Sequence, residues 1–113
     1  MQMLKEYLGK SVHVVIDRPL GGVHPKHKNI AYELNYGYIP NTIGGDGEEI
    51  DAYIMGVSAP LSTFDGVVIA IIHRYNDNEQ KLVVARENQV FTREEIARAV
   101  DFQEKFFKTS IIM

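Results

Sequence analysis

The sequence predicts a small, mainly β domain of the α+β class, in which a mostly antiparallel barrel precedes one C-terminal helix. Strand-length segments of alternating or β-branched residues recur between turn signals as far as residue 85, and a helical period appears only after that point. The chain has 113 residues, which is enough for one small hydrophobic core. We therefore expect residues 1–113 to form a single domain.

The first ten residues predict one short helical turn, with Leu4 and Tyr7 on the same side and Gly9 at its end. Residues 11–17 alternate between apolar and polar side chains, which indicates a strand with one face on the core. Pro19 and the glycines that follow it end this strand.

Three further strands are predicted along the chain. Residues 51–56 alternate, and residues 67–73 form a continuous apolar run rich in β-branched side chains, which is typical of a central strand. Residues 81–85 return after a polar turn at residues 75–79. The last two segments therefore predict a hairpin whose tip carries acidic residues.

The C-terminal part predicts a helix that opens with a capping box formed by Thr92 and Glu95. Apolar side chains then recur at helical spacing, and the helix is expected to run to about Lys108. Phe106 and Phe107 are interpreted as core packing.

Composition narrows the function classes. The absence of cysteine excludes disulfides and thiolate metal sites, so a metal would have to be held by oxygen or imidazole ligands. The net charge of −3 argues against a general nucleic-acid-binding protein. No apolar run has the length of a signal peptide core or a membrane span, so we expect a cytoplasmic protein that does not bind membranes.

The stretch of residues 35–51 is interpreted as a site rather than a core element. Asp46, Glu48 and Asp51 crowd three carboxylates into a glycine-rich turn, and such a cluster is relieved by a hard divalent cation. Solvated acids beside an Asp-Gly turn are the simpler alternative. A calcium loop of the EF-hand type fits poorly, because Asp51 stands where that loop needs glycine and Val57 where it needs glutamate.

Tyr32, residues 35–39, Thr42 and residues 46–52 together resemble the signature region of the family I soluble inorganic pyrophosphatases. Glu48 is the one departure in the acidic part, where the family has aspartate. The resemblance extends over about residues 11–107. It implies an OB-like five-stranded barrel, hydrolysis of pyrophosphate by metal-activated water, and a homo-oligomer, either a trimer or a hexamer.

The resemblance also implies roles for individual residues. Glu48 would accept a proton from the attacking water, with Asp51 and Tyr36 as the other catalytic residues. A pair of Mg²⁺ ions, or Mn²⁺ as a substitute, would be held by carboxylates; the candidates are Asp46, Glu48, Asp51, Glu79, Asp77 and Asp17. The candidates for contact with substrate phosphates are Lys81, Tyr32, Arg18, Lys26, Lys28 and Lys108.

The chain departs from the family pattern in several places. The basic hairpin that supplies phosphate ligands is shortened, and Arg74 falls where the family has a further aspartate. Phe106-Phe107-Lys108 stands where relatives have a Tyr-Lys pair. Two alternatives therefore stay open: hydrolysis of another phosphoanhydride of the nucleotide type, and a catalytically degenerate protein that only binds metal or phosphate.

Two more readings concern aromatic and imidazole side chains. His24 and His27 would form a metal-binding pair or, as we expect, belong to a solvated or phosphate-facing loop. A binding module that stacks bases on Tyr32, Tyr36 and Tyr38 is a further alternative. The acidic cluster beside these tyrosines argues against nucleic acid as a partner.

Overall fold

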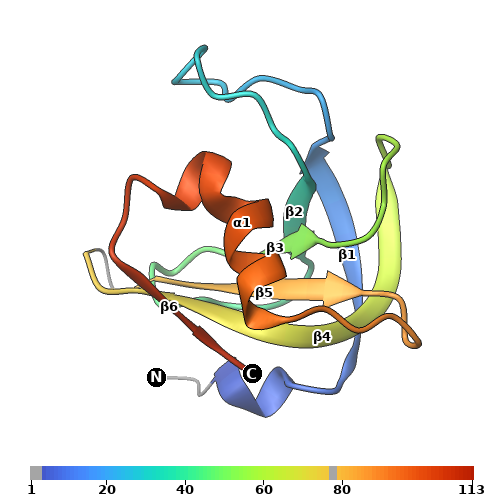
Figure 1. The fold of residues 1–113 in the computed structure, drawn as a ribbon. Helices are drawn as coiled ribbons and strands as arrows, with labels where there is room; N and C mark the ends of the chain where they lie inside the picture. Colours follow the sequence, from blue (N-terminus) through green and yellow to red (C-terminus); the bar gives the residue numbers. More distant parts are fainter. Residues whose placement is uncertain (1–3, 77–78) are drawn as a thin grey trace.

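The computed structural model describes residues 4–76 and 79–113, and it confirms a mainly β fold with one C-terminal helix (Figure 1). In chain order the elements are the 3-10 helix η1 (Leu4–Tyr7), β1 (Ser11–Arg18), β2 (Asn35–Ile39), β3 (Ile50–Ile54), β4 (Thr63–Arg74), β5 (Gln80–Ala85), the helix α1 (Arg93–Glu104) and β6 (Thr109–Ile112).

Five strands close into a barrel in the order β1-β2-β3-β5-β4, with β4 pairing back onto β1. This confirms the five-stranded barrel that the resemblance implied. One pair, β3 with β5, is parallel, because β4 carries the chain back across the barrel before β5 begins. The sixth strand, β6, was not expected; it adds to β4 along Ile71–Arg74.

Two hydrophobic clusters form the core, one on each face of the sheet. Val14, Ile54 and Leu82 belong to the cluster formed by the barrel strands and η1. Tyr53 and Ile96 belong to the other cluster, which lies between the strands and α1. Neighbouring residues of one strand fall into different clusters because side chains alternate between the faces of a sheet. Helix α1 therefore packs on the outside of the barrel, across β4 and β5 (Figure 1).

The expectation that residues 35–51 are not a core element is wrong for their first part, because β2 is a buried strand of the barrel. A Cβ atom on Gly37 would lie 1.9 Å from the carbonyl oxygen of Val15, so only glycine permits β1 and β2 to approach this closely. Asn35 is fully buried, and its side-chain oxygen accepts hydrogen bonds from the backbone N–H groups of Leu20 and Leu61.

Helix α1 begins as predicted and ends earlier than predicted. Thr92 and Glu95 form both hydrogen bonds of the capping box. The helix ends at Glu104, because the chain then turns and leads into β6. Lys108 and the two phenylalanines before it therefore lie outside the helix, in the turn between α1 and β6.

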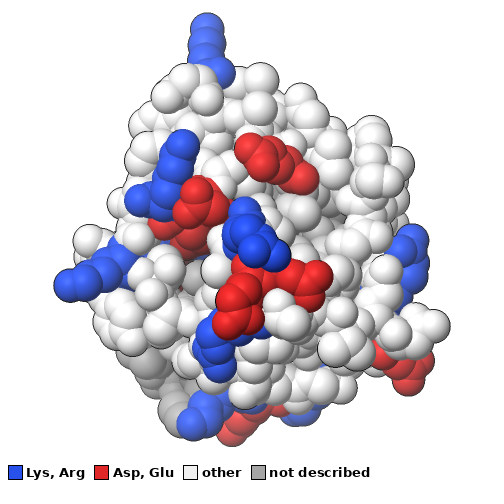
Figure 2. Space-filling view, viewed as in Figure 1, with Lys and Arg blue, Asp and Glu red and all other residues white. Residues whose placement is uncertain are grey.

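The face of the molecule that carries α1 shows basic and acidic side chains in alternation, without a continuous area of one sign (Figure 2). Such a surface lacks the basic stripe that nucleic-acid-binding proteins present. Within residues 4–76 and 79–113, helices are too short or too polar to cross a bilayer.

Candidate active site

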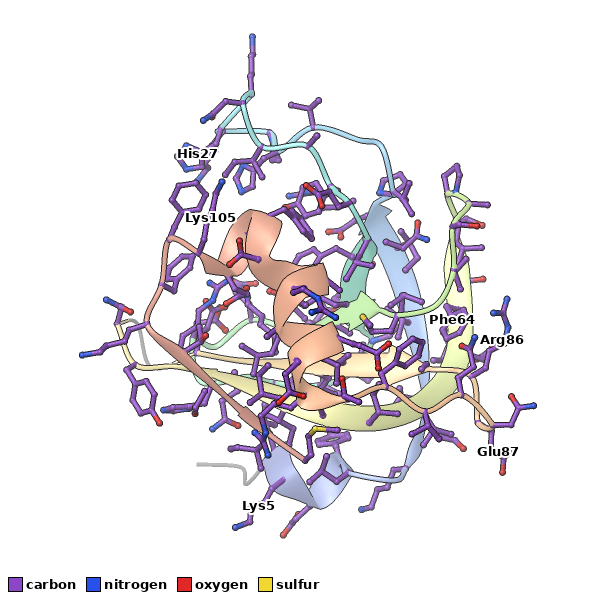
Figure 3. All side chains as sticks on the ribbon, viewed as in Figure 1. Lys5, His27, Phe64, Arg86, Glu87 and Lys105 are labelled. Carbon is purple, nitrogen blue, oxygen red and sulfur yellow. The ribbon has the colours of Figure 1, made fainter. Side chains whose placement is uncertain are left out.

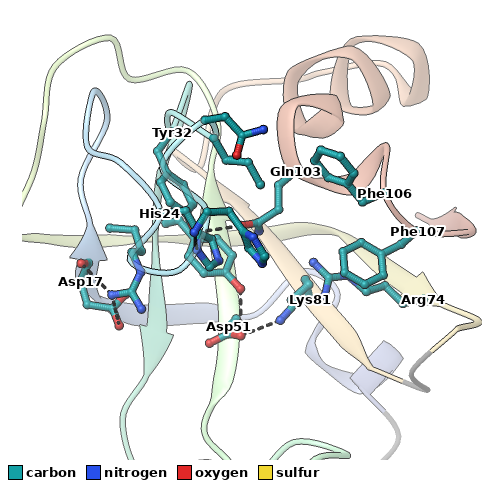
Figure 4. Close-up of a pocket in the computed structure, with 14 residues that line it drawn as sticks. Asp17, His24, Tyr32, Asp51, Arg74, Lys81, Gln103, Phe106 and Phe107 are labelled. Atoms are coloured by element: carbon teal, nitrogen blue, oxygen red, sulfur yellow. Dashed lines mark hydrogen bonds and ion pairs between the residues drawn. The ribbon is translucent and has the colours of Figure 1, made fainter.

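A pocket of about 520 Å³ opens between the 19–31 loop, the ends of the barrel strands and the turn after α1 (Figure 4). His27 marks the part of this loop that lies above the C-terminal end of the helix (Figure 3). The residues that line the pocket are Asp17, Arg18, His24, His27, Asn29, Ile30, Tyr32, Tyr36, Asp51, Arg74, Lys81, Gln103, Phe106 and Phe107.

Three adjacent strands bring together Tyr36, Asp51 and Lys81, which are three of the site residues expected from the sequence. The Tyr36 hydroxyl donates to Oδ2 of Asp51 at 2.9 Å, and the Lys81 ammonium donates to the same oxygen at 2.6 Å. Lys81 also donates to Oε1 of Glu79 at 2.8 Å. Glu79 directly precedes β5, so its side chain lies on the same side of the chain as that of Lys81, two residues further on.

The Tyr36 hydroxyl keeps its proton beside Asp51. Burial, and then the charge of Asp51, raise the pKa of Tyr36 well above its usual value, so its hydroxyl remains a donor. Both hydrogen bonds use Oδ2 of Asp51, and the described residues donate no hydrogen bond to its Oδ1. The side chain of Asp51 is 29% exposed and lines the pocket, so this second oxygen is accessible to a ligand.

Arg74 places a second buried cation beside Lys81. Its guanidinium donates to both carboxylate oxygens of Glu104, at 2.9 and 2.6 Å, and to Oε2 of Glu79 at 3.2 Å. The central carbon of the Arg74 guanidinium, Cζ, lies 3.8 Å from the ring centre of Phe107. Burial lowers the pKa of Arg74, but the hydrogen bond that Arg74 donates to Glu104 and the charge of Glu104 raise this pKa by more, so the side chain stays cationic.

A hydrogen-bonded chain connects this cation to the helix and the neighbouring strands. Tyr53 donates to Oε2 of Glu104 at 2.5 Å and accepts from the Gln103 amide at 2.6 Å. The Tyr32 hydroxyl donates to Oε1 of the same Gln103 amide at 2.8 Å. Buried polar groups that are all satisfied hold one geometry, so this chain fixes the position of Arg74.

The third predicted metal ligand, Asp46, reaches the same acids from the exposed turn before β3. Asp46 and Glu79 lie close enough for each carboxyl group to shift the pKa of the other. Burial, opposed by Lys81 and reinforced by Asp46, raises the pKa of Glu79. Burial also raises the pKa of Asp46, but the hydrogen bond from the Glu48 backbone N–H and the interaction with Glu79 lower this pKa overall. Glu79 therefore holds a proton more readily than a solvated glutamate does.

The carboxylates of Asp46, Asp51 and Glu79 are the groups in this site that could hold the expected metal ion. Two carboxyl groups in contact require a proton or a cation between them, and oxygen-only donors suit Mg²⁺ or Mn²⁺. In the described part of the chain no three His, Asp or Glu side chains are already arranged around one point. Asp46, Asp51 and Glu79 therefore fit one hard cation in donor chemistry, while Lys81 presently neutralises two of them. A second cation would need a further carboxylate, and this chain has the guanidinium of Arg74 in its place.

Asp17 and Arg18, at the end of β1, line the pocket as predicted. A guanidinium nitrogen of Arg18 lies 3.6 Å from Oδ2 of Asp17. Burial raises the pKa of Asp17, Arg18 opposes this shift, and the charge of Asp51 adds to it. Asp17 therefore holds a proton more readily than a solvated aspartate does.

Other predicted site residues lie elsewhere. Lys26, Lys28 and Lys108 are exposed and do not line the pocket. Glu48 is also exposed and outside the pocket, so its expected role as proton acceptor finds no support in this geometry. Asp77 lies outside the described residues.

Several pocket residues escaped the sequence prediction. Arg74 was noted only as a residue that stands where the family has an aspartate, and Gln103 only falls within the segment expected to be a helix. The sequence signal was the pair of polar residues Gln103 and Glu104 near the end of the expected helix. In the structure α1 buries both of them. Phe106, expected in the core, is 57% exposed at the pocket. Tyr32 and Tyr36 are buried, so they do not offer the stacking surface of a single-strand-binding module.

Comparison with known proteins gives one family. The model of the inorganic pyrophosphatase family matches residues 6–110. A sequence comparison with curated proteins found no match.

Solved structures with a similar fold are also inorganic pyrophosphatases. That of Ehrlichia chaffeensis superposes with a TM-score of 0.69 at 15% identity, over 91% of this chain and 85% of that one. The structure from Coxiella burnetii superposes with a TM-score of 0.67 at 12% identity, over 92% of this chain and 84% of that one. That of Neisseria gonorrhoeae gives 0.62 at 20% identity, over 88% and 79%. At these identities the likeness shows the fold.

Proposed function

Because this chain belongs to the inorganic pyrophosphatase family, we propose that it hydrolyses pyrophosphate to two phosphates in the pocket beside Asp51. The single observation that carries the proposal is the convergence of Tyr36 and Lys81 on one oxygen of Asp51. This arrangement leaves the other oxygen of a fixed carboxylate toward the pocket, next to two buried cations.

Positive charge for the substrate comes from Lys81, Arg18 and Arg74, which all line the pocket. Charge-assisted hydrogen bonds from such groups bind phosphate oxygens and stabilise the charge that develops in the transition state. Arg74 is held by Glu104 and Glu79, so it contributes mainly a fixed positive field. Lys81 and Arg18 are the groups that we assign to direct contact with phosphate.

The attacking water must lose a proton as its oxygen bonds to one phosphorus and the bridging P–O bond breaks. We assign the acceptor role to Asp17 in place of Glu48, because Asp17 lines the pocket and its pKa is raised. A base with a pKa nearer the working pH accepts a proton more effectively. Tyr36 holds Asp51 in place and does not take part in the proton transfer.

Members of this family depend on metal ions in general. We propose Mg²⁺ for this chain, with Mn²⁺ as a substitute, held by Asp46, Asp51 and Glu79. Such an ion lowers the pKa of a water and neutralises phosphate charge. A homo-oligomer, a trimer or a hexamer, stays a proposal by family resemblance.

The test is phosphate release from pyrophosphate by the purified chain with Mg²⁺. We expect turnover, and we expect Asp51→Asn to lower kcat/KM by about 100-fold or more, as removal of a preorganised catalytic group does. Asp101→Asn makes the same chemical change on the exposed side of α1 and serves as the matched control. No phosphate release from the folded protein, or equal rates for the two variants, would contradict the proposal.

A further inference from the structure

We propose that the pocket accepts a nucleoside diphosphate, with the base against His24 and Phe106 and the two phosphates beside Lys81 and Arg18. This inference rests on the proposed function, because it uses the same P–O–P chemistry. A nucleoside diphosphate is a pyrophosphate with one oxygen esterified, so it presents the same bond to the same charged groups.

The first argument is size. A cavity of about 520 Å³ lies in the range that holds drug-sized ligands, which are far larger than pyrophosphate. Asp51 and Lys81 lie together at the lower centre of Figure 4, with Arg74 on one side of them and Asp17 on the other. Pyrophosphate bound there would leave the rest of the cavity to water.

The second argument is the chemistry of the remaining walls. Phe106 lies apart from the Asp51–Lys81 pair in Figure 4, and His24, Ile30 and Tyr32 also line the pocket. Phe106 is 57% exposed, so folding leaves much of its ring uncovered. An apolar ring of this kind gains by covering a flat ligand, and aromatic side chains stack on any base.

The third argument is that His24 is fixed and neutral. Its Nδ1 accepts hydrogen bonds from the backbone N–H groups of Lys26 at 3.0 Å and His27 at 3.2 Å. An accepting Nδ1 places the proton on Nε2. Burial, and then the charges of His27, Arg18 and Lys26, lower the pKa of His24. The imidazole is therefore held in one orientation and offers a flat, uncharged surface that suits a base.

The reaction balances without a further reactant. The oxygen of one water bonds to the terminal phosphorus, the P–O bond to the bridging oxygen breaks, and that oxygen stays with the nucleoside monophosphate. The proton of the water passes to Asp17. The products are inorganic phosphate and a nucleoside monophosphate.

The experiment compares ADP, GDP, CDP and UDP with pyrophosphate in phosphate release with Mg²⁺, and measures binding of the monophosphate product AMP by calorimetry. Phe106→Ala removes the exposed ring. His24→Asn removes the imidazole but keeps a side-chain oxygen that accepts from the N–H groups of the loop. Val90→Ala and His13→Asn make comparable changes at exposed positions outside the pocket.

We expect hydrolysis of at least one nucleoside diphosphate. We expect each pocket variant to raise the KM for that nucleoside diphosphate about tenfold more than the KM for pyrophosphate. The reason is that stacking of one base contributes a factor of about ten to binding. AMP binding should weaken in parallel, and the control variants should show no such difference.

Pyrophosphate turnover without hydrolysis or binding of any nucleotide would overturn the inference and leave the proposed function intact. Equal effects of Phe106→Ala on both substrate classes would overturn it as well. Ring-dependent AMP binding by a protein that hydrolyses neither substrate would support the base site and refute the proposed function.

Discussion

Glu104, the last residue of α1, holds the guanidinium of Arg74 with both carboxylate oxygens, at 2.9 and 2.6 Å. Their side chains are 4% and 6% exposed, so the pair is almost fully removed from water. The end of a helix outside the barrel thus fixes a cation in the wall of the pocket.

Glu104→Gln should destabilise the fold, because it leaves Arg74 buried with only part of its counter-charge. Removal of one partner from a buried pair costs about 3 kcal/mol or more. Urea denaturation at equilibrium measures the change, with Glu87→Gln at an exposed position as the control. Equal midpoints for the two variants would show that Glu79 alone compensates Arg74.

Lys81→Met should separate substrate binding from metal binding. Its ammonium neutralises Asp51 and Glu79, so its loss should lower kcat/KM for pyrophosphate about 100-fold and strengthen binding of Mn²⁺ to the freed carboxylates. Kinetics and calorimetry with Mn²⁺ measure the two effects. Lys105→Met, an exposed lysine, is the control. Weaker Mn²⁺ binding in the Lys81 variant would place the ion away from these acids.

Tyr36→Phe removes one donor to Asp51 and keeps the ring in the core. Because Asp51 then loses part of its orientation, we expect kcat to fall about tenfold with little change in KM. Steady-state kinetics test this expectation. Tyr75→Phe, which removes an exposed hydroxyl near Ser110, should leave both constants unchanged. A change confined to KM would mean that Tyr36 contacts the substrate directly.

Asp17→Asn should raise stability at neutral pH and lower activity. Burial raises the pKa of Asp17 in the folded protein, so the folded state binds this proton more tightly than the unfolded chain. Stability is therefore full below the unfolded pKa and is lost as pH rises through the folded pKa. Melting temperatures across pH should show an advantage of the variant at neutral pH that vanishes at acid pH.

The same substitution tests the proposed base. The wild-type rate should fall as pH drops through the raised pKa of Asp17, whereas the residual rate of Asp17→Asn should lack this acid limb. Asp101→Asn should keep it. An acid limb that persists in Asp17→Asn would assign the proton acceptor to another carboxylate.

Chelation of divalent ions should abolish phosphate release, and added Mg²⁺ or Mn²⁺ should restore it. Mg²⁺ should also raise the melting temperature, since a ligand that binds only the folded state stabilises it. Glu79→Gln should remove most of this shift and Glu87→Gln none of it. A shift that survives in Glu79→Gln would refute the proposed ligand set.

Several of the site residues expected from the sequence meet at one pocket because they lie at fixed spacing on strands. Asp51 and Lys81 sit on β3 and β5, where a two-residue period determines which side chains share a face, and Glu79 directly precedes β5. Tyr36 lies directly upstream on β2. The family pattern and the strand geometry therefore agree at these positions.

The rest of the site depends on tertiary structure that local patterns do not encode. The path of the 19–31 loop directs His24 into the pocket and leaves Lys26 and Lys28 outside it. The partner of Arg74 comes from a helix thirty positions away in sequence. Strand β6 is short, and its pairing with β4 rather than its own composition makes it a strand.

The closing seam of the barrel joins β1 to β4, two strands far apart along the chain, and the residues between them contribute β2 and β3. The ends of this long segment must meet before the seam can form, and the entropy of that encounter slows assembly. We therefore expect refolding on a timescale of about milliseconds to seconds, slower than for a helical protein of equal length. The pocket can exist only after this last step, since its walls come from both sides of the seam.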